Sequence, residues 1–121
     1  MRLGTLVIAL ALTAPVATAG KATLEISTTA DRASDRVMGT RAAVFRACFQ
    51  KEMNRNPSLR EHASRLELHV SVDKGNPHVP VFDEKASVND DNVKSCVALT
   101  IKRLTFPKTA TELDYTLTFT P

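Results

Sequence analysis

The most reactive side chains of this sequence are its two cysteines, Cys48 and Cys96. They form neither a Cys-x-x-Cys redox pair nor the four-ligand set of a structural zinc site. Two cysteines in an exported domain most simply form a disulfide, so we predict a covalent bond between them. A free catalytic thiol is the alternative, although neither cysteine has a histidine nearby in the sequence to activate it.

The acidic side chains predict no catalytic centre. The pairs Asp83-Glu84 and Asp90-Asp91 have the positions of a turn and of a helix start, so we interpret them as capping groups rather than as an acid and a base. The sequence contains no phosphate-binding glycine-rich loop, no metalloprotease helix and no nucleophile elbow. We therefore expect no enzymatic activity, no catalytic residue and no cofactor.

Histidine and aspartate side chains come together in one segment. His69, His78 and Asp73 could share the outer face of a predicted hairpin, with His62 nearby, and such a set could hold a metal loosely. Sequence spacing alone fixes no coordination geometry, so we predict a solvated polar face and no metal site.

Residues 1–19 have the pattern of a secretory signal peptide. A basic residue precedes an apolar core at residues 3–12, and Ala17-Thr18-Ala19 supplies a small-x-small cleavage pattern before Gly20. A short membrane anchor is the alternative, but Pro15 interrupts the apolar run. We therefore expect an exported, periplasmic protein that has no membrane span after cleavage.

The composition is typical of one folded domain, expected at residues 20–121. The sequence is 43% hydrophobic and 24% charged, and its formal charge of +3 is mild. Trp is absent, so no stacking platform for bases is expected. Nucleic-acid binding is therefore not predicted, since the basic residues of the first long helix point in several directions: Arg36, Arg41, Arg46, Lys51 and Arg55.

The first half of the domain predicts a strand and a long helix. Residues 21–27 alternate between apolar and polar side chains, which is typical of a half-buried strand. The period becomes helical over residues 36–54, with Ser34 or Asp35 as the cap and Cys48 beside the apolar face. The apolar face contains Met38, Ala42, Phe45, Phe49 and Met53.

A hairpin is predicted next. Residues 65–73 alternate cleanly, Gly75 supplies a turn, and residues 78–82 form the return strand. Pro77 and Pro80 cannot donate hydrogen bonds, so the return strand is expected to be an edge or to be irregular. The expected pairs are Val72 with Pro77, Val70 with Val79, and Leu68 with Val81.

The last two elements are a helix and a strand. The helix begins near Asn89 or Asp90, carries Cys96 beside its apolar face and ends before Pro107. Residues 113–119 alternate and are rich in aromatic and β-branched side chains, which favours a strand. The order β-α-β-β-α-β predicts an α+β fold, a small antiparallel sheet with two helices packed on one face.

The ordered motifs resemble the TonB C-terminal-like domain, in the variant found at the C-termini of the myxobacterial gliding-motility proteins AgmX and PglI. The likeness extends from about Met38 to the end of the chain. In chain order the matching motifs are Cys48-Phe49, Met53, Asn56-Pro57-Ser58-Leu59, the strand from Leu66 to the turn residue Gly75, Cys96-Val97, Phe106-Pro107 and the aromatic-rich end from Tyr115 to Pro121.

The resemblance implies a cell-envelope fold that binds extended segments of partner proteins by strand pairing. We therefore expect a non-catalytic binding module whose last strand, if it lies at an edge, accepts the partner, because it contains neither Pro nor Lys. A homodimer formed at that edge is an alternative, and so is a small secreted enzyme or enzyme inhibitor. The predicted partner-binding residues are Leu113, Tyr115, Thr116, Leu117, Thr118 and Phe119.

Mass spectrometry of the purified native protein tests the predicted cleavage. The mature chain is expected to begin at Gly20 and to fractionate with soluble periplasmic proteins, because cleavage removes the apolar segment. A native chain that keeps residues 1–19 and is recovered in the membrane fraction would contradict both expectations.

Overall fold

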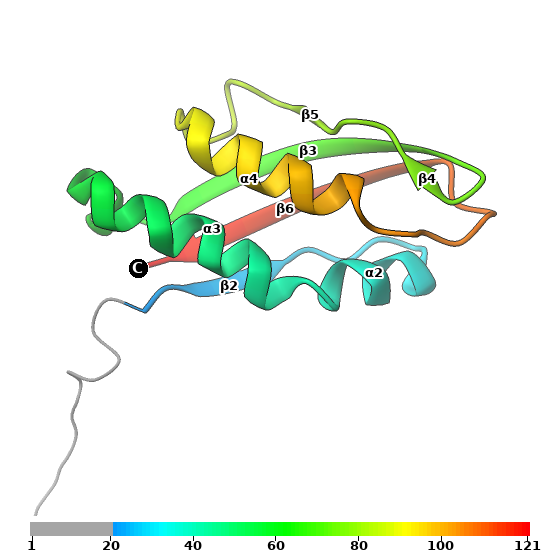
Figure 1. Cartoon of the computed structure of the whole chain (residues 1–121), viewed down its shortest axis with the longest axis horizontal. Helices are drawn as coiled ribbons and strands as arrows, with labels where there is room; N and C mark the ends of the chain where they lie inside the picture. The colour runs from blue at the N-terminus through cyan, green and yellow to red at the C-terminus, as the bar shows by residue number, and fades with distance from the viewer. Residues whose placement is uncertain (1–20) are drawn as a thin grey trace, which may run out of the picture.

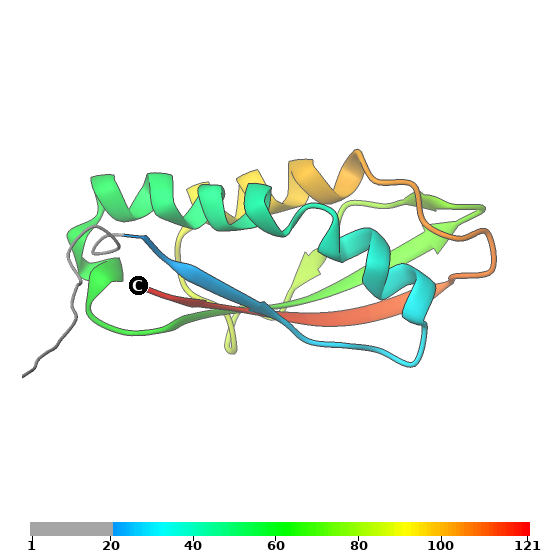
Figure 2. The same ribbon diagram turned by 90° about the horizontal axis from the view of Figure 1, so that it is seen from below.

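The computed structural model describes residues 21–121, so the predicted signal peptide lies outside the described residues. An antiparallel sheet forms one layer, and helices cover one of its faces (Figures 1 and 2). The predicted α+β class is confirmed. The elements are β2 (Thr23–Ile26), α2 (Arg32–Gly39), α3 (Ala42–Arg55), the 3-10 turn η1 (Pro57–Arg60), β3 (Ser64–Asp73), β4 (Asn76–Pro77), β5 (Val81–Phe82), α4 (Asp91–Lys102) and β6 (Glu112–Thr120).

The strands do not lie in chain order. The sheet order is β2-β6-β3-β4, and β5 pairs with another part of β3. The last strand is thus between the first strand and the hairpin, as the red β6 ribbon in Figure 1 shows. The pairing of β3 with β6 runs from Ser64↔Phe119 to Ser71↔Glu112, and that of β2 with β6 from Thr23↔Thr120 to Ile26↔Leu117.

The condition placed on residues 113–119 as the partner-binding strand, that they lie at an edge of the sheet, is therefore not met. β6 pairs with β3 along nearly its whole length and with β2 along its second half. Its inward side chains are all buried, and they are Leu113, Tyr115, Leu117 and Phe119. In the middle of a sheet, the strands on both sides and the helices above exclude water from such a strand. This position therefore buries the largest apolar area and stabilises the fold most.

The predicted long first helix is two helices. α2 begins before the predicted start, because Asp31 rather than Ser34 or Asp35 is the cap: its carboxylate accepts hydrogen bonds from the Ser34 N–H at 3.0 Å and the Ser34 hydroxyl at 2.8 Å. The helix ends at Gly39, a residue that weakens helices. The Thr40 hydroxyl donates to the Val37 carbonyl at 2.6 Å, which satisfies a carbonyl at this end.

The predicted hairpin register holds only beside the turn. Val72 faces Pro77 as expected, but Leu68 faces Phe82 and His69 faces Val81, one residue away from the prediction. The chain leaves the ladder between β4 and β5, where Pro80 has no N–H to donate. A shift of one residue reverses the faces of a strand, and Val81 is 68% exposed instead of buried.

The helices and the sheet share one core, and a disulfide joins two of the helices above it. Phe49 of α3 stacks on Phe119 of β6 with 4.8 Å between ring centroids. The predicted bond between Cys48 and Cys96 is present and joins α3 to α4 across a Cα–Cα distance of 5.7 Å. Of the two predicted start residues, Asn89 and Asp90, it is Asp90 that caps α4, by accepting a hydrogen bond from the Val93 N–H at 3.0 Å.

Removal of the disulfide should lower the free energy of unfolding without changing the fold. The bond closes a loop of sequence separation 48, and constraining such a loop in the unfolded chain contributes about 4 kcal/mol in the chain-entropy treatment. We expect the double variant C48A/C96A to lose about that amount in urea unfolding, and reduced wild type to match it. Free thiols in unreduced, denatured wild-type protein, or a double variant as stable as the wild type, would contradict this prediction.

Candidate functional site

The two edges of the sheet differ in how they are covered. The outer edge of β3 is hydrogen-bonded along its length by the segment that follows it. Besides β4 and β5, three further main-chain bonds close it: His78 N to Ser71 O at 2.8 Å, Asp83 N to Glu67 O at 2.8 Å and Val88 N to Arg65 O at 2.7 Å. That covering segment contains Pro77 and Pro80, which blunt it as a template for another strand.

The outer edge of β2 is open. Ser27 directs its main chain toward β6, since its N–H donates to the Thr116 carbonyl at 2.9 Å. Alternate residues of an antiparallel strand direct their N–H and C=O groups to the same side, so those of Leu24 and Ile26 point away from β6. No other strand within residues 21–121 pairs with that side of β2.

The side chains of β2 give this edge one apolar face and one polar face. Leu24 and Ile26 are half-buried and pack against the core on the helix side, whereas Thr23 and Glu25 are exposed on the opposite face. The start of the strand is held to α3, because the Ala22 N–H donates to the Gln50 side-chain carbonyl at 2.8 Å. An apolar side chain added beside Leu24 or Ile26 would therefore extend the existing core.

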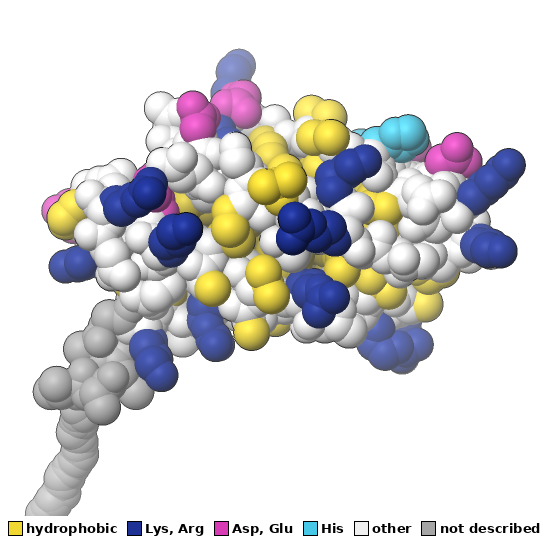
Figure 3. Space-filling model, viewed as in Figure 1, with side chains coloured by type: hydrophobic (Ala, Val, Ile, Leu, Met, Phe, Trp, Pro, Cys, Tyr) yellow, Lys and Arg dark blue, Asp and Glu magenta, His cyan; other side chains and the backbone are white. Residues whose placement is uncertain are grey.

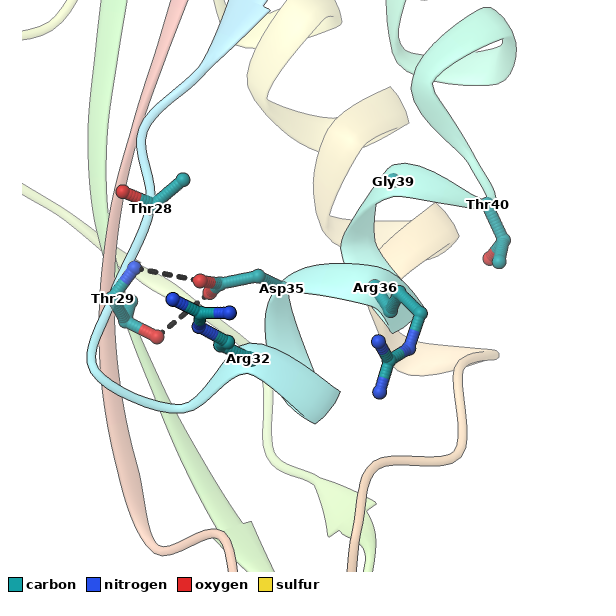
Figure 4. Close-up of a pocket in the computed structure, with 7 residues that line it drawn as sticks. All are labelled: Thr28, Thr29, Arg32, Asp35, Arg36, Gly39 and Thr40. Atoms are coloured by element: carbon teal, nitrogen blue, oxygen red, sulfur yellow. Dashed lines mark hydrogen bonds between the residues drawn. The ribbon is translucent and has the colours of Figure 1, made fainter.

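A hollow of about 800 Å³ lies at the end of β2 (Figure 4). It is open to solvent between the β2–α2 loop and the junction of α2 with α3, as the figure shows. Arg32 and Arg36 of α2 are exposed at its border, and neither has an ion-pair partner among the described residues. The lining residues are Thr28, Thr29, Arg32, Asp35, Arg36, Gly39 and Thr40.

Asp35 is the acid of this hollow, and it acts as an anchor. Its carboxylate accepts the Thr29 hydroxyl at 2.7 Å, the Thr29 N–H at 2.9 Å and the Tyr115 hydroxyl at 2.8 Å. Burial alone would raise the pKa of Asp35, but these hydrogen bonds outweigh burial and lower it. Burial, followed by the bond to Asp35, raises the pKa of Tyr115. A carboxylate held in this way is a poor proton acceptor, so the hollow offers no general base.

The other cluster of ionisable groups lies on β3 and β6. His69 bonds to Asp114 through Nδ1 at 2.7 Å and to Glu112 through Nε2, and the Ser71 hydroxyl donates to Glu112 at 2.9 Å. The hydrogen bonds to Asp114 and Glu112 raise the pKa of His69. Both ring nitrogens are engaged, and the described part of the chain contains no group of three or more His, Cys, Asp or Glu residues suited to a metal.

The structure thus separates the predicted binding residues from the open edge. The four apolar members of the predicted set are in the core, while Thr116 and Thr118 are half-buried on the face opposite the helices. The open edge belongs to Leu24 and Ile26, and the hollow beside it to Arg32 and Arg36. The alternation of residues 21–27 predicted the strand, but nothing in the sequence indicated which neighbours it would have.

No protein-family model matches the chain, and no curated protein or solved structure matches it. The resemblance to the TonB C-terminal-like domain therefore stays a prediction. The disulfide fits an oxidising compartment. Within residues 21–121, no helix has both the length and the apolar character that crossing a bilayer requires.

The Asp35 anchor predicts a specific loss of stability in acid. Because the folded state lowers the pKa of Asp35, its stabilising contribution is present above the ordinary carboxyl value of 3.8 and is lost as the pH falls through the lowered value. We expect Y115F to lose about 2 kcal/mol at neutral pH, as is typical of a hydrogen bond to a charged group.

Between neutral pH and the acid range below the ordinary carboxyl value of 3.8, D35N should flatten the pH dependence of unfolding relative to the wild type, because the Asp35 contribution is lost there. Urea unfolding over this range measures both effects. A D35N profile as steep as that of the wild type would contradict the assigned role of Asp35.

Proposed function

We propose that this protein is a non-catalytic binding module of the bacterial cell envelope. It captures an extended segment of a partner protein as an added strand along β2. The observation that supports the proposal most strongly is the open edge of β2, whose outward main-chain groups at Leu24 and Ile26 pair with no other strand of residues 21–121.

The sequence of β2 supports the same function. Natural proteins protect exposed edges with Pro, with Lys and other charges, or with bulges. Residues 23–27 contain neither a Pro nor a Lys, and their one charged residue, Glu25, is exposed on the face opposite the helices. The opposite edge of the sheet, at β3, is in contrast covered by the segment that contains Pro77 and Pro80. Main-chain bonds would supply affinity, and a short contact of this kind predicts a dissociation constant on the order of 1 μM.

Compartment and resemblance are consistent with this proposal. The signal-peptide pattern of residues 1–19 and the disulfide favour export to the periplasm. The resemblance to the TonB C-terminal-like domain supports strand pairing in the cell envelope. The strand that accepts the partner, however, is β2 in this proposal and no longer the last strand.

The alternative of a small secreted enzyme or inhibitor has less support. The carboxylate of the 800 Å³ hollow is hydrogen-bonded to Thr29 and Tyr115, and both ring nitrogens of His69 are hydrogen-bonded to carboxylates. These groups have no free proton acceptor to offer a substrate.

A proline at position 24 tests the proposal directly. L24P removes an N–H that points away from β6 and so should leave the β2–β6 ladder intact, whereas L24A removes the same side chain but keeps the N–H. We expect crosslinked pull-downs from a periplasmic extract to lose the partner with L24P and to retain it with L24A. Thermal unfolding serves as the check that both variants fold.

The opposite outcome is informative as well. If folded L24P recovers the same partner as L24A and the wild type in equal yield, β2 is not the binding edge.

A further inference from the structure

Cationic side chains stand at both ends of the open β2 edge. Arg32 and Arg36 line the hollow after the strand. A second hollow, of about 220 Å³, lies beside the start of the strand and is lined by Lys21, Ala43, Arg46, Ala47 and Gln50. The hydrogen bond from Ala22 to Gln50 fixes this second hollow next to the first residues of β2.

These cations are not neutralised by neighbours. Lys21, Arg32, Arg36 and Arg46 are exposed, and the ion pairs among residues 21–121 involve other cations. Of the acids nearby, Asp31 caps α2 and Asp35 binds Thr29 and Tyr115. Glu25 of β2 is exposed on the face opposite the helices and forms no ion pair with these cations. Figure 3 shows Lys and Arg side chains spread over the lower half of this face, the part where β2, α2 and α3 lie in Figure 1.

We propose that the segment captured along β2 is acidic, with one carboxylate bound at each end of the strand. The inference rests on the function proposed above and specifies the chemistry of its partner. Arg32 and Arg36 bind the carboxylate near the end of β2, and Lys21 and Arg46 bind the one near its start. Guanidinium groups favour carboxylates because they donate in a planar fork.

The geometry of a strand fixes the spacing of the two carboxylates. An added strand pairs with the outward main chain of Leu24 and Ile26. The Ala22 N–H is already bound by Gln50, so the residues level with Ala22 and Thr28 lie just beyond the paired part of β2, on its helix side. Carboxylates opposite Ala22 and Thr28 are then six residues apart, with apolar residues opposite Leu24 and Ile26. The preferred segment reads acidic-x-apolar-x-apolar-x-acidic, which is the same pattern in either chain direction.

Charge also argues against a second copy of the chain as the occupant. Antiparallel pairing of two β2 edges about a two-fold axis places both helix layers on the same side of the joined sheet. The end of β2 in one copy then meets the start of β2 in the other, so Arg32 and Arg36 face Lys21 and Arg46. Like charges brought together in this way oppose association, whereas an acidic segment neutralises them.

Peptide titration tests the proposal. The probe is an end-capped, fluorescently labelled heptapeptide of glutamate, threonine, valine, threonine, valine, threonine and glutamate, and its two controls carry glutamine or lysine at both ends. We expect fluorescence anisotropy with the mature, oxidised protein to give about tenfold tighter binding of the acidic than of the glutamine peptide at low salt. The lysine peptide should bind weakest, and added salt should reduce the preference.

Variants assign the effect to the two ends of the edge. R36Q and R46Q should each weaken the acidic peptide about threefold and leave the glutamine peptide unchanged. R103Q, which changes the net charge equally at the end of α4, should change neither affinity. If R36Q and R103Q weaken the acidic peptide equally, the net charge of the protein alone explains the preference for that peptide, and the proposal is overturned.

The same titrations separate this inference from the function on which it rests. Equal affinity for the acidic and glutamine peptides, abolished by L24P, would overturn the acidic preference and keep strand capture. An acidic preference that survives L24P would mean that strand pairing is not involved and would overturn both. No binding of any peptide, or a dimer in sedimentation that L24P dissociates, would also overturn the acidic segment as the occupant.

Discussion

The burial of β6 is the constraint on which the rest of the structure depends. Tyr115, Leu117 and Phe119 are at most 2% exposed, and Phe119 stacks on Phe49 of α3. Each such side chain contributes about 1.5–3 kcal/mol when it is fully removed from water. With β6 between β2 and β3, β2 is an edge of the sheet that residues 21–121 form. The open main chain at Leu24 and Ile26 is a consequence of this arrangement.

A hydrogen bond between Tyr115 of β6 and Asp35 of α2 fixes β6 relative to the helix beside the open edge. The Tyr115 hydroxyl needs a hydrogen-bond partner where the ring enters the core, and Asp35 of α2 supplies it at 2.8 Å. The same carboxylate holds Thr29 in the β2–α2 loop. Because Asp35, Arg32 and Arg36 belong to one short helix, the anchor also fixes where the two arginines lie relative to β2. Stability and the proposed recognition of an acidic segment therefore depend on one helix placement.

The two edges of the sheet differ in how their unpaired main-chain groups are covered. Unpaired N–H and C=O groups at an edge are a template for another chain. The β3 edge is closed by β4, β5 and the residues up to Val88, a segment in which two prolines remove donors. The β2 edge has no such cover within the described residues, and its flanks carry cations instead. The two edges therefore differ in both cover and charge, and the proposed capture of an acidic segment rests on this difference.

Local patterns in the sequence determined the strand and helix types, the start of α4 at Asn89 or Asp90 and the pairing of Cys48 with Cys96. Alternation of period two and helical periods report which face of a segment is buried, and that information is local. Tertiary structure decided the order of the strands, because the choice of neighbours depends on contacts between residues far apart in the chain. For this reason residues 113–119 could be predicted as a strand but not as an interior one, and Arg32, Arg36, Lys21 and Arg46 could not be predicted to share one edge. The helix break at Gly39 and the interruption of the return strand at Pro80 have local causes, whereas the register of β5 depends on how the chain packs against β3.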